Sequence, residues 1–371
     1  METAHRVLHC VVNLNRGGAE TLLMNLYRSI DRSQMQFDFL TCNEGVYDAE
    51  VIEKGGRIYR IPYLTKVGPA EYVRQLRRFF YEHPEYTIVH SHMDKMSGIV
   101  LREAKKSGIP VRIAHSHNTR SEGNAAVRLF KAYGGSFLAH SATDRFACSK
   151  AAAQWLFGNQ VTDVRILNNG VQAGEFRFSP TVREDVRGEL KVGPSTLLLG
   201  HVGRFQEQKN HRFLLDILER LLPENPNVKL VLVGEGPLLS KIKVLAEEKG
   251  VFNHILFLGS RGDVNRVLQA MDVFCFPSLH EGLPVTLIEA QAAGLPCLVS
   301  ERVTGEADLG VGLMKFLPII DPLDWVKAIG GYSPNQERPV IDLAACGYDI
   351  DLSANALMDF YCDKFRTGRE L

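Results

Sequence analysis

The chain carries no excess of charge of either sign, no long apolar run and no internal repeat. Its 43 Lys and Arg residues are balanced by 43 Asp and Glu residues, so the formal net charge is zero and gives no support to nucleic-acid binding. No apolar run approaches the roughly 20 residues that span a membrane. Low-complexity segments are also lacking. This composition is that of a soluble globular protein.

Cysteine is present, but its placement suits neither disulfides nor zinc. The count is odd and no Cys-x-x-Cys spacing occurs; the seven positions are Cys10, Cys42, Cys148, Cys275, Cys297, Cys346 and Cys362. Several lie in apolar, strand-like runs, which favours buried free thiols in a reducing cytosol. The start of the chain enters a strand-like run directly, so we also expect no signal peptide and a cytoplasmic location.

The length of 371 residues predicts two domains, because single cores stop growing at roughly 250 to 300 residues. In the C-terminal half, four apolar runs each end in a glycine-rich or polar turn before a helical pattern; they lie at 196–203, 228–233, 254–258 and 272–276. The N-terminal half opens in the same way, with a strand at 7–12. Such units indicate an α/β fold with doubly wound parallel sheets, in which ligands collect beyond the carboxyl ends of the strands.

The segment from Phe276 to Ala290 carries two carboxylates eight positions apart. Glu281 precedes a predicted helix at 285–293, whereas Glu289 lies more than one turn inside it. Backbone amides at the start of this helix would face an anion, which the helix dipole favours; the residues concerned are Leu283, Pro284, Val285 and Thr286. The carboxylates can then accept hydrogen bonds from a sugar on one side of a diphosphate and a ribose on the other. The alternative is a solvated turn glutamate and a glutamate on a helix face.

Two cations accompany these carboxylates. Arg204 and Lys209 lie in the loop between the strand at 196–203 and the next helix. A guanidinium and an ammonium group together can neutralise a diphosphate. The two following strands end at Gly234 and Gly259, which we place on the same donor-binding edge. Two solvated loop cations are the alternative interpretation.

Together these motifs resemble the family 4 glycosyltransferases, which are retaining enzymes of the GT-B fold. The resemblance rests on Gly203-Arg204 with Lys209-Asn210, Gly234-Glu-Gly-Pro237, Phe257-Leu-Gly259, and Glu281 followed eight residues later by Glu289. The turn at Gly17 and Gly18 looks like the first loop of that family, whose bare backbone lies against the diphosphate and the transferred sugar. In its whole pattern the chain is similar to bacterial exopolysaccharide and capsule transferases.

The resemblance implies two Rossmann-like domains, each with a doubly wound parallel sheet, that face each other across a cleft. We expect residues 1–171 to form the acceptor-side domain, completed by a C-terminal helix at about 351–366, and residues 172–350 to form the nucleotide-sugar donor domain. Two segments of the first domain, 71–81 and 125–138, combine basic and apolar positions. They suit packing against the first sheet, which we favour, or peripheral contact with the inner face of the plasma membrane.

The activity implied by the resemblance is transfer of a hexosyl unit from a nucleotide diphosphate sugar, expected to be a UDP-sugar. The acceptor would be a hydroxyl of a glycan or lipid-linked sugar, and the anomeric configuration would be retained. Arg204 and Lys209 would stabilise the departing diphosphate, Glu281 would hold hydroxyls of the transferred sugar, and Glu289 would hold those of the ribose. Because fixed cations and a helix N-terminus supply the neutralisation, we expect no metal and no cofactor.

Histidines follow two strands of the first domain. The pairs His90-Ser-His92 and His115-Ser-His117 each place two imidazoles on one strand face. No third ligand has a matching spacing, so the sequence predicts no metal site. Family 4 enzymes place a histidine after a corresponding strand, near the transferred sugar and acceptor. We assign this role to His117, keep His115 as the alternative, and place Asn118 on the acceptor side.

Three other functions share parts of this pattern. A UDP-sugar 2-epimerase has the same architecture and binds the same donor, so it is the main alternative. A dinucleotide-binding dehydrogenase is suggested by Asn15-Arg-Gly-Gly18 and Gly234-Glu-Gly236, but neither completes Gly-x-Gly-x-x-Gly. The third is a catalytically silent carbohydrate-binding subunit. The presence of all four charged site residues argues against it; these are Arg204, Lys209, Glu281 and Glu289.

Overall fold

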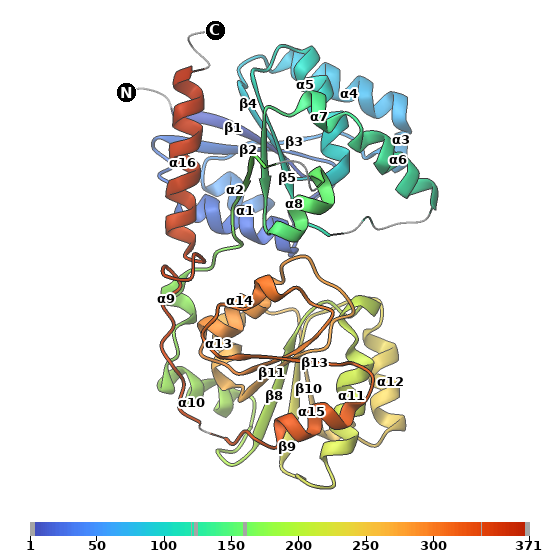
Figure 1. The fold of residues 1–371 in the computed structure, drawn as a ribbon, viewed down its shortest axis with the longest axis vertical. Helices are drawn as coiled ribbons and strands as arrows, with labels where there is room; N and C mark the ends of the chain where they lie inside the picture. The colour runs from blue at the N-terminus through green and yellow to red at the C-terminus, as the bar shows by residue number, and fades with distance from the viewer. Residues whose placement is uncertain (1–3, 120, 122–124, 159–161, 335, 368–371) are drawn as a thin grey trace. The chain divides into compact units, whose positions relative to one another are not determined.

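The structure is a computed structural model that describes residues 4–119, 121, 125–158, 162–334 and 336–367. It divides into two compact units, one comprising Met1–Gly170 and Gly347–Leu371, the other Val171–Cys346. Each unit contains one parallel sheet with helices packed on it (Figure 1). The predicted fold class, two Rossmann-like domains with doubly wound sheets, is therefore confirmed.

The first unit contains a seven-stranded sheet in the order β3-β2-β1-β4-β5-β6-β7. All neighbouring strands are parallel; their bounds are β1 His5–Cys10, β2 Met35–Thr41, β3 Ile58–Arg60, β4 Ile88–Ser91, β5 Val111–Ser116, β6 Asp144–Ala147 and β7 Val164–Ile166. The chain winds outward from β1 to β3 and then returns to place β4 on the other side of β1. This reversal is a topological switch point, where ligands bind in such sheets.

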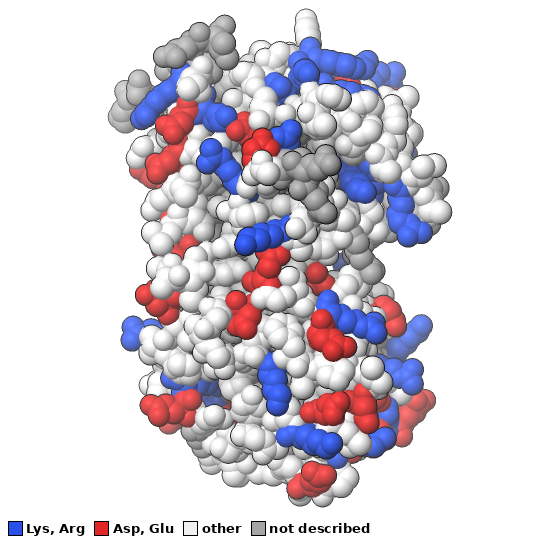
Figure 2. Space-filling view, in the orientation of Figure 1, with Lys and Arg blue, Asp and Glu red and all other residues white. Residues whose placement is uncertain are grey.

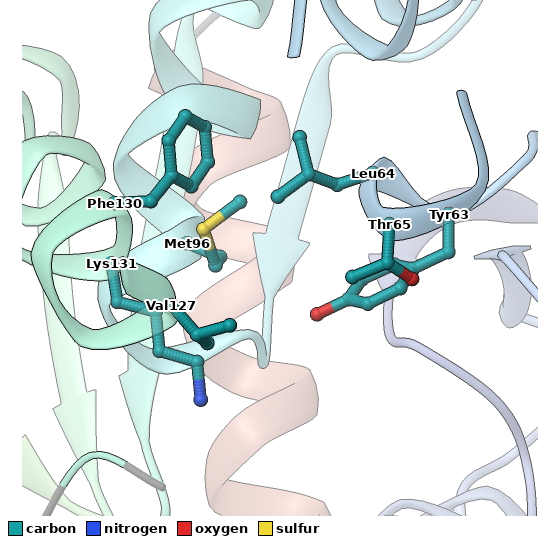
Figure 3. A pocket seen from close by; sticks show the side chains of 7 residues that line it. All are labelled: Tyr63, Leu64, Thr65, Met96, Val127, Phe130 and Lys131. Atoms are coloured by element: carbon teal, nitrogen blue, oxygen red, sulfur yellow. The ribbon is translucent and has the colours of Figure 1, made fainter. Parts of the chain in front are cut away.

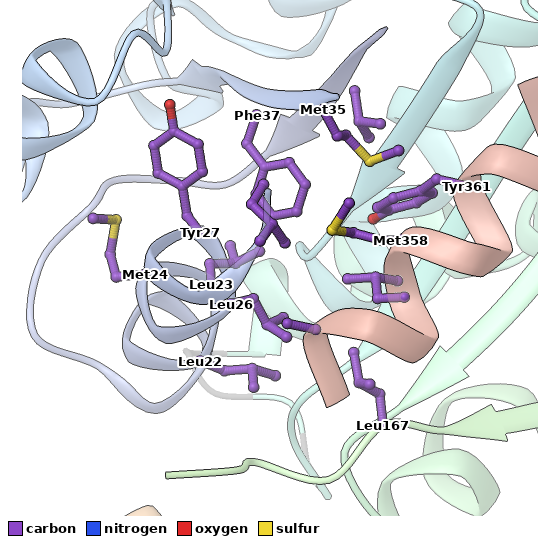
Figure 4. Packing of buried hydrophobic residues seen from close by; sticks show 14 of the residues in the cluster. Leu22, Leu23, Met24, Leu26, Tyr27, Met35, Phe37, Leu167, Met358 and Tyr361 are labelled. Carbon is purple, nitrogen blue, oxygen red and sulfur yellow. The ribbon is translucent and has the colours of Figure 1, made fainter. Parts of the chain in front are cut away.

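Helices on both faces bury the apolar strands of the first unit. They are α1 Gly18–Ser29, α2 Asp48–Glu53, α3 Leu64–Val67, α4 Pro69–Glu82, η1 Asp94–Met96, α5 Ser97–Lys106, α6 Ala125–Gly135, α7 Leu138–Ser141, α8 Lys150–Phe157 and α16 Ile350–Thr367. The last of these packs against α1, and its Met358 and Tyr361 lie close to Phe37 (Figure 4). Spacings of three and four between its apolar positions put them on one face.

Helix α4 buries its apolar side in the core of the first unit. This agrees with the packing that we favoured for residues 71–81. Leu76, Phe79 and Phe80 belong to the core, whereas its arginines are exposed. Basic side chains gather at the top of the view in Figure 2, over α4 and α5. Among the described helices, none combines the length and apolar character needed to cross a bilayer.

The second unit contains a six-stranded parallel sheet in the order β10-β9-β8-β11-β12-β13. The strand bounds are β8 Leu197–Val202, β9 Val228–Val233, β10 Ile255–Gly259, β11 Val273–Phe276, β12 Cys297–Ser300 and β13 Met314–Leu317. Its helices are α9 Ala173–Phe176, α10 Pro180–Glu189, η2 Glu207–Lys209, α11 His211–Leu221, α12 Leu239–Glu248, η3 Phe252–His254, α13 Val264–Ala270, α14 Val285–Ala292, η4 Gly305–Ala307 and α15 Pro322–Ile329. The switch point falls between β8 and β11, whose residues are all buried.

A buried charge cluster that the sequence analysis did not identify fixes the amino end of β11. The Asp272 carboxylate accepts from Arg183 at 2.5 Å, from Arg187 at 3.3 Å and from the amide of Leu198 at 2.8 Å. Arg183 also donates to the carbonyl of Ala270 at the end of α13. The cluster therefore ties α10, α13, β8 and β11 together. All seven cysteines are free and five are buried, which confirms the predicted buried thiols.

Candidate functional site

The carboxyl edge of the second unit's sheet is built from glycine turns that pack backbone against backbone. Gly203 follows β8 and donates to the carbonyl of Val233 at 2.9 Å, and Gly234 donates to the carbonyl of Gly259 at 2.8 Å. A Cβ atom on Gly234, whose φ is +141°, would lie 2.2 Å from the carbonyl oxygen of Gly203. No side chain fits there. Gly234 and Gly259 therefore join the ends of β8, β9 and β10 into one edge.

Lys209 and Glu281 meet at this edge in a largely buried ion pair. Nζ of Lys209, in η2, lies 2.7 Å from Oε1 of Glu281, and the side chains are 14% and 9% exposed. The ammonium group also lies 4.7 Å from the centre of the Phe276 ring. The sequence predicted separate ligand contacts for these residues, whereas the structure shows that they also hold each other in place.

Hydrogen bonds fix the loop that carries Glu281. Nδ2 of Asn210 donates to the carbonyl of Pro277 at 3.2 Å, and Nε2 of Gln208 donates to the carbonyl of His280 at 2.9 Å. Asn210 has a left-handed backbone with φ +53°, which asparagine tolerates better than most residues. The loop and η2 thus form one connected support for the ion pair.

Arg204 differs from Lys209 in its surroundings. Its side chain is exposed and forms no hydrogen bond or ion pair with any residue that the structure describes. A guanidinium group in this state can bind two oxygens of a phosphate at once. Of the two predicted phosphate-binding cations, one is therefore engaged in a pair and the other is open to a ligand.

The N-terminus of α14 lies after the loop that carries Glu281. Pro284 is its N-cap, with extended backbone, and no side chain caps the helix. The predicted residues Leu283, Pro284 and Val285 are buried and Thr286 is partly buried. First-turn amides have no acceptor within a helix, so this end can receive an anion.

Glu289 lies one turn after Thr286 on the same face of α14. Burial raises the pKa of the Glu289 carboxyl from the ordinary 4.5 to about 7. The polar atoms of this unit that are buried without a partner among the described residues include Oγ1 of Thr286, Oγ of Ser278 and Nε2 of His201. Buried polar atoms are normally hydrogen-bonded, so each of these atoms can bind a water or a polar ligand.

In the first unit, the predicted glycine turn leads into α1. Gly17 is the N-cap, and a Cβ atom there would lie 2.3 Å from Oε2 of Glu20, whereas Gly18 has open space. The carboxylate of Glu20 therefore lies at the start of the helix, where the dipole favours negative charge. Burial, helped by the nearby charge of Asp94, raises the pKa of Glu20. Glu20 belongs to the Gly-Gly-Ala-Glu turn that resembles the family's first loop, but no role was predicted for it, because the contact of its carboxylate with the turn depends on the folded backbone.

Five histidines gather at the carboxyl ends of the central strands of the first unit. They are His9, His90, His92, His115 and His117. His92 lies between His9 and His117, with ring nitrogens 3.0 Å and 2.9 Å away, and the three form a row. Nε2 of His9 and Nδ1 of His117, the two ends of this row, are buried without a partner among the described residues.

A second row runs through His90. Its ring nitrogens lie 2.5 Å from the hydroxyl of Tyr361 and 3.1 Å from Nδ1 of His115. Burial lowers the pKa of every histidine in both rows, to about 3 for His9 and His117 and well below 6.5 for the others. All five imidazoles are therefore neutral near pH 7.

The histidines form two groups of three that could hold a metal ion. These are His9 with His90 and His92, and His92 with His115 and His117; in each group the ligand atoms lie within 4.8 Å of one another. Neutral imidazole is a common zinc ligand. The expectation that no third ligand accompanies the pairs is therefore corrected. Strand order brings His9 of β1 beside β4, and it brings the pairs on β4 and β5 beside each other.

Asp94 connects the predicted acceptor-side residues. Its Oδ1 accepts from the amide of His117 at 3.0 Å, and its Oδ2 accepts from Nδ2 of Asn118 at 2.5 Å. His115 is fully buried, whereas His117 is partly exposed and Asn118 is exposed. Of the two candidate histidines, His117 is thus the more exposed, although its Nδ1 is itself buried and its Nε2 pairs with His92.

Known proteins resemble the chain over both units. Residues 182–310 match the family described as glycosyl transferases group 1, and residues 17–170 match the glycosyl transferase 4-like domain. Among solved structures, Anabaena HepE in complex with UDP-glucose aligns with a TM-score of 0.74 at 18% identity, covering 95% of this chain and 94% of HepE. WaaG, a glycosyltransferase involved in lipopolysaccharide biosynthesis, aligns with a TM-score of 0.72 at 18% identity, covering 95% of each chain. At such identities these likenesses show the fold alone.

Proteins found by their sequences are more nearly identical to this chain than those structures are. The glycosyltransferase EpsF of Bacillus subtilis (strain 168) is 36% identical over 368 residues, covering 96% of each chain. A UDP-Gal:alpha-D-GlcNAc-diphosphoundecaprenol alpha-1,3-galactosyltransferase of Escherichia coli is 28% identical over 71% of this chain and 72% of its own length. The capsular polysaccharide biosynthesis glycosyltransferase CapH of Staphylococcus aureus is 25% identical over 77% and 78%. The 36% identity to EpsF extends over nearly the full length of both chains. It shows that this chain belongs to the same family of GT-B glycosyltransferases as EpsF.

Proposed function

We propose that the chain transfers a hexosyl unit from a UDP-sugar to a hydroxyl of a growing glycan in exopolysaccharide or capsule biosynthesis. The observation that carries this proposal is the set of charged residues at the carboxyl edge of the second sheet, where the exposed Arg204 follows β8 and the Lys209–Glu281 pair joins the next turn to the loop after β11. The names of EpsF, CapH and the galactosyltransferase relative support the same class of reaction.

In the proposed reaction the bond between the anomeric carbon and the diphosphate oxygen breaks, and its electron pair leaves with the diphosphate. A bond forms from the acceptor oxygen to the same face of that carbon, so the configuration is retained. The acceptor proton passes to the departing phosphate oxygen. Arg204, Lys209 and the first amides of α14 oppose the negative charge that accumulates, which is the term that contributes most in such transfers. No divalent metal is required for this neutralisation.

The carboxylates orient the donor. A carboxylate has about four acceptor positions, so Glu281 can hold Lys209 and still receive sugar hydroxyls. Glu289, one turn inside α14, would receive the ribose hydroxyls and Gly259 would lie near the base. On the first unit, the open backbone at Gly18 is a further candidate for donor binding.

The test is to compare Arg204→Ala and Lys209→Ala with the parent protein. A panel of sugar nucleotides is first screened by thermal stabilisation and by hydrolysis without acceptor, which identifies the donor. With that donor, each variant should lose roughly a hundredfold or more in kcat, because each removes one stabiliser of the leaving group. Arg220→Ala, which removes an exposed cation at the end of α11, serves as the control. Rates within about twofold of the parent for both variants would reject the proposal.

Product analysis of the same reactions separates transfer from epimerisation. A lengthened acceptor supports transfer with retention when the new linkage keeps the donor's anomeric configuration. Release of an epimeric sugar from the donor alone would favour the epimerase alternative. Activity that persists in excess EDTA would support the metal-independent mechanism, and complete loss would contradict it.

A further inference from the structure

Three histidines at the carboxyl end of the first sheet are close enough to share one metal ion. They are His92, which follows β4, His115, which lies in β5, and His117, which follows β5. One ring nitrogen of each lies within 4.8 Å of those of the other two. In a tetrahedral zinc site with Zn–N bonds of about 2.0–2.1 Å, the ligand nitrogens lie about 3.3 Å apart. Rotation of these side chains can therefore bring the three nitrogens onto one ion.

One hydrogen bond has to break for this group to receive an ion. Nδ1 of His92 and Nε2 of His117 lie 2.9 Å apart and share that bond. Nε2 of His115 is buried without a partner among the described residues. Because buried polar atoms are normally paired, an unpaired ring nitrogen at this place points to a ligand. A bound ion would give the nitrogen of His115 a partner and would replace the bond between the other two rings.

The other ring nitrogens of two of these ligands are already held. Nε2 of His92 lies 3.0 Å from Nδ1 of His9, and Nδ1 of His115 lies 3.1 Å from Nε2 of His90. Metal-binding histidines almost always donate their second ring N–H to a neighbouring acceptor, which fixes the tautomer and the orientation of the ring. His9 and His90 can be these acceptors. The buried histidines around the group thus supply the support that a metal site needs.

The second group of three, His9 with His90 and His92, suits an ion less well. Both ring nitrogens of His90 lie within hydrogen-bond distance of other groups, one of Tyr361 and one of His115. Both ring nitrogens of His92 are likewise paired. An ion in this group would therefore break a bond at each of these two rings. His92 belongs to both groups, so we assign the site to the group that loses fewer hydrogen bonds.

The first unit also contains an apolar cavity of about 210 Å³, which suits a different kind of occupant. Its walls include Leu64, Met96, Val127 and Phe130, and Figure 3 shows these side chains around one space. None of its lining residues is a histidine, a cysteine or an acidic residue. These are the side chains that bind zinc, so the cavity offers an ion no ligands.

A carboxylate supports the histidine group from the neighbouring turn. Oδ1 of Asp94, in η1, accepts from the backbone amide of His117 at 3.0 Å. Asp94 has a left-handed backbone with φ +48°, which aspartate tolerates better than most residues. Its negative charge beside one of the three ligands favours a cation at this end of the sheet.

We propose that His92, His115 and His117 bind one divalent transition-metal ion such as Zn²⁺. Imidazole is a ligand that such ions prefer, and three histidines leave a fourth position to water or to another ligand. The proposed transfer reaction needs no ion. The site is therefore a second property of the chain, and its test requires neither donor nor acceptor.

The first test titrates the full chain with Zn²⁺ and, separately, with Mg²⁺ in a calorimeter. One Zn²⁺ per chain should bind with a Kd of about 1 µM or less. Mg²⁺, which prefers oxygen ligands, should bind at least about a hundredfold more weakly. Equal binding of the two ions, or no saturable binding of Zn²⁺, would overturn the proposal.

X-ray absorption at the zinc edge then identifies the ligands in the parent protein. The Zn²⁺ complex should show three imidazole ligands and no sulfur, although the chain has seven free cysteines. Sulfur in the coordination sphere would assign the ion to thiolates and overturn the proposal. Because this measurement uses the parent protein, it does not depend on a variant that folds.

Two substitutions locate the ion. His117→Gln removes the most exposed of the three ligands and should weaken Zn²⁺ binding at least about a hundredfold, whereas His9→Gln removes an outer acceptor and should weaken it about ten- to a hundredfold. His140→Gln, at an exposed histidine of α7, is the matched control and should leave the Kd within about twofold. A Kd unchanged in His117→Gln, or a larger loss in His9→Gln, would place the ion elsewhere and overturn the assignment.

Discussion

The carboxyl edges of the two sheets share a winding pattern but differ in chemistry. In the second unit the edge holds the buried Lys209–Glu281 pair and the exposed Arg204. In the first unit the corresponding edge holds five neutral imidazoles, near an apolar cavity. Fixed charges suit an anionic ligand, whereas neutral imidazoles can donate to or accept from a hydroxyl group. One fold thus presents two kinds of chemistry, set by the side chains at the strand ends.

The two units also contain buried polar clusters of different kinds. In the second unit the carboxylate of Asp272 lies between two arginines. In the first unit, besides the paired carboxylates of Asp38 and Glu103, hydrogen bonds link neutral rings and a tyrosine hydroxyl. Removing one partner from each set should therefore have unequal consequences. A lost charge leaves other charges buried and unpaired, which costs more than a lost neutral hydrogen bond.

The largest effect is expected for Asp272→Asn. The change leaves the guanidinium groups of Arg183 and Arg187 buried without their counter-charge. The free energy of unfolding of the second unit should fall by about 3–5 kcal/mol. Each unit has one tryptophan, Trp155 in the first and Trp325 in the second, so 5-fluorotryptophan gives one fluorine NMR signal per unit during urea unfolding.

The control for this measurement is Asp324→Asn, an exposed carboxylate of α15 in the second unit. Its effect should stay within about 0.5 kcal/mol, as for most surface changes. Equal losses at both tryptophan signals after Asp272→Asn would contradict a role confined to the second unit.

Glu281→Gln should give the next largest effect. The variant keeps the shape of the side chain but removes the charge that holds Lys209. Hydrogen bonds to charged groups contribute about 1.5–3 kcal/mol, so kcat should fall roughly ten- to a hundredfold. Initial rates at saturating donor measure this, with the exposed Glu224→Gln as control. Unchanged turnover would show that the ion pair has no part in catalysis.

Tyr361→Phe tests the neutral network of the first unit. The hydroxyl lies 2.5 Å from Nδ1 of the buried His90, and its removal leaves that nitrogen unpaired. The first unit should lose about 1–3 kcal/mol of stability, seen at the Trp155 signal and not at Trp325. Tyr81→Phe, at a largely exposed tyrosine of the same unit, should change neither signal. A loss as large as that of Asp272→Asn would remove the contrast between the charged cluster and the neutral one.

The smallest effect concerns the pH dependence of donor binding. The Glu289 carboxyl has a pKa of about 7 in the folded protein and 4.5 ordinarily. At pH values between these two pKa values, the folded state binds more protons than the unfolded state. The stability of the ligand-free protein should therefore fall as the pH rises from about 5 to 8. Only the carboxylate accepts from both ribose hydroxyls, so UDP affinity should rise about three- to tenfold over pH 6–8. Glu289→Gln should remove both trends in calorimetry, and a persistent trend would assign them to another group.

The sequence predicted the fold well because its signals are local. Buried strands such as Val228–Val233 read as apolar runs, and glycine turns such as Gly234 mark the strand ends. The same logic brought the charged residues to one edge, since all follow parallel strands. Their mutual contact could not be predicted, because Lys209 and Glu281 are 72 positions apart and their meeting depends on side-chain packing. Strand spacing likewise gave two histidine pairs but not His9, whose neighbours depend on strand order.

The row of His9, His92 and His117 has a consequence for how it meets a partner. Three neutral rings carry three protons, but the row contains two hydrogen bonds, so one end always keeps an unshared N–H. If all rings are the δ tautomer, His117 offers a donor at Nδ1; if all are the ε tautomer, it offers a lone pair. A concerted shift along the row exchanges these states without creating an imidazolium, so the buried Nδ1 of His117 can change between donor and acceptor at constant charge.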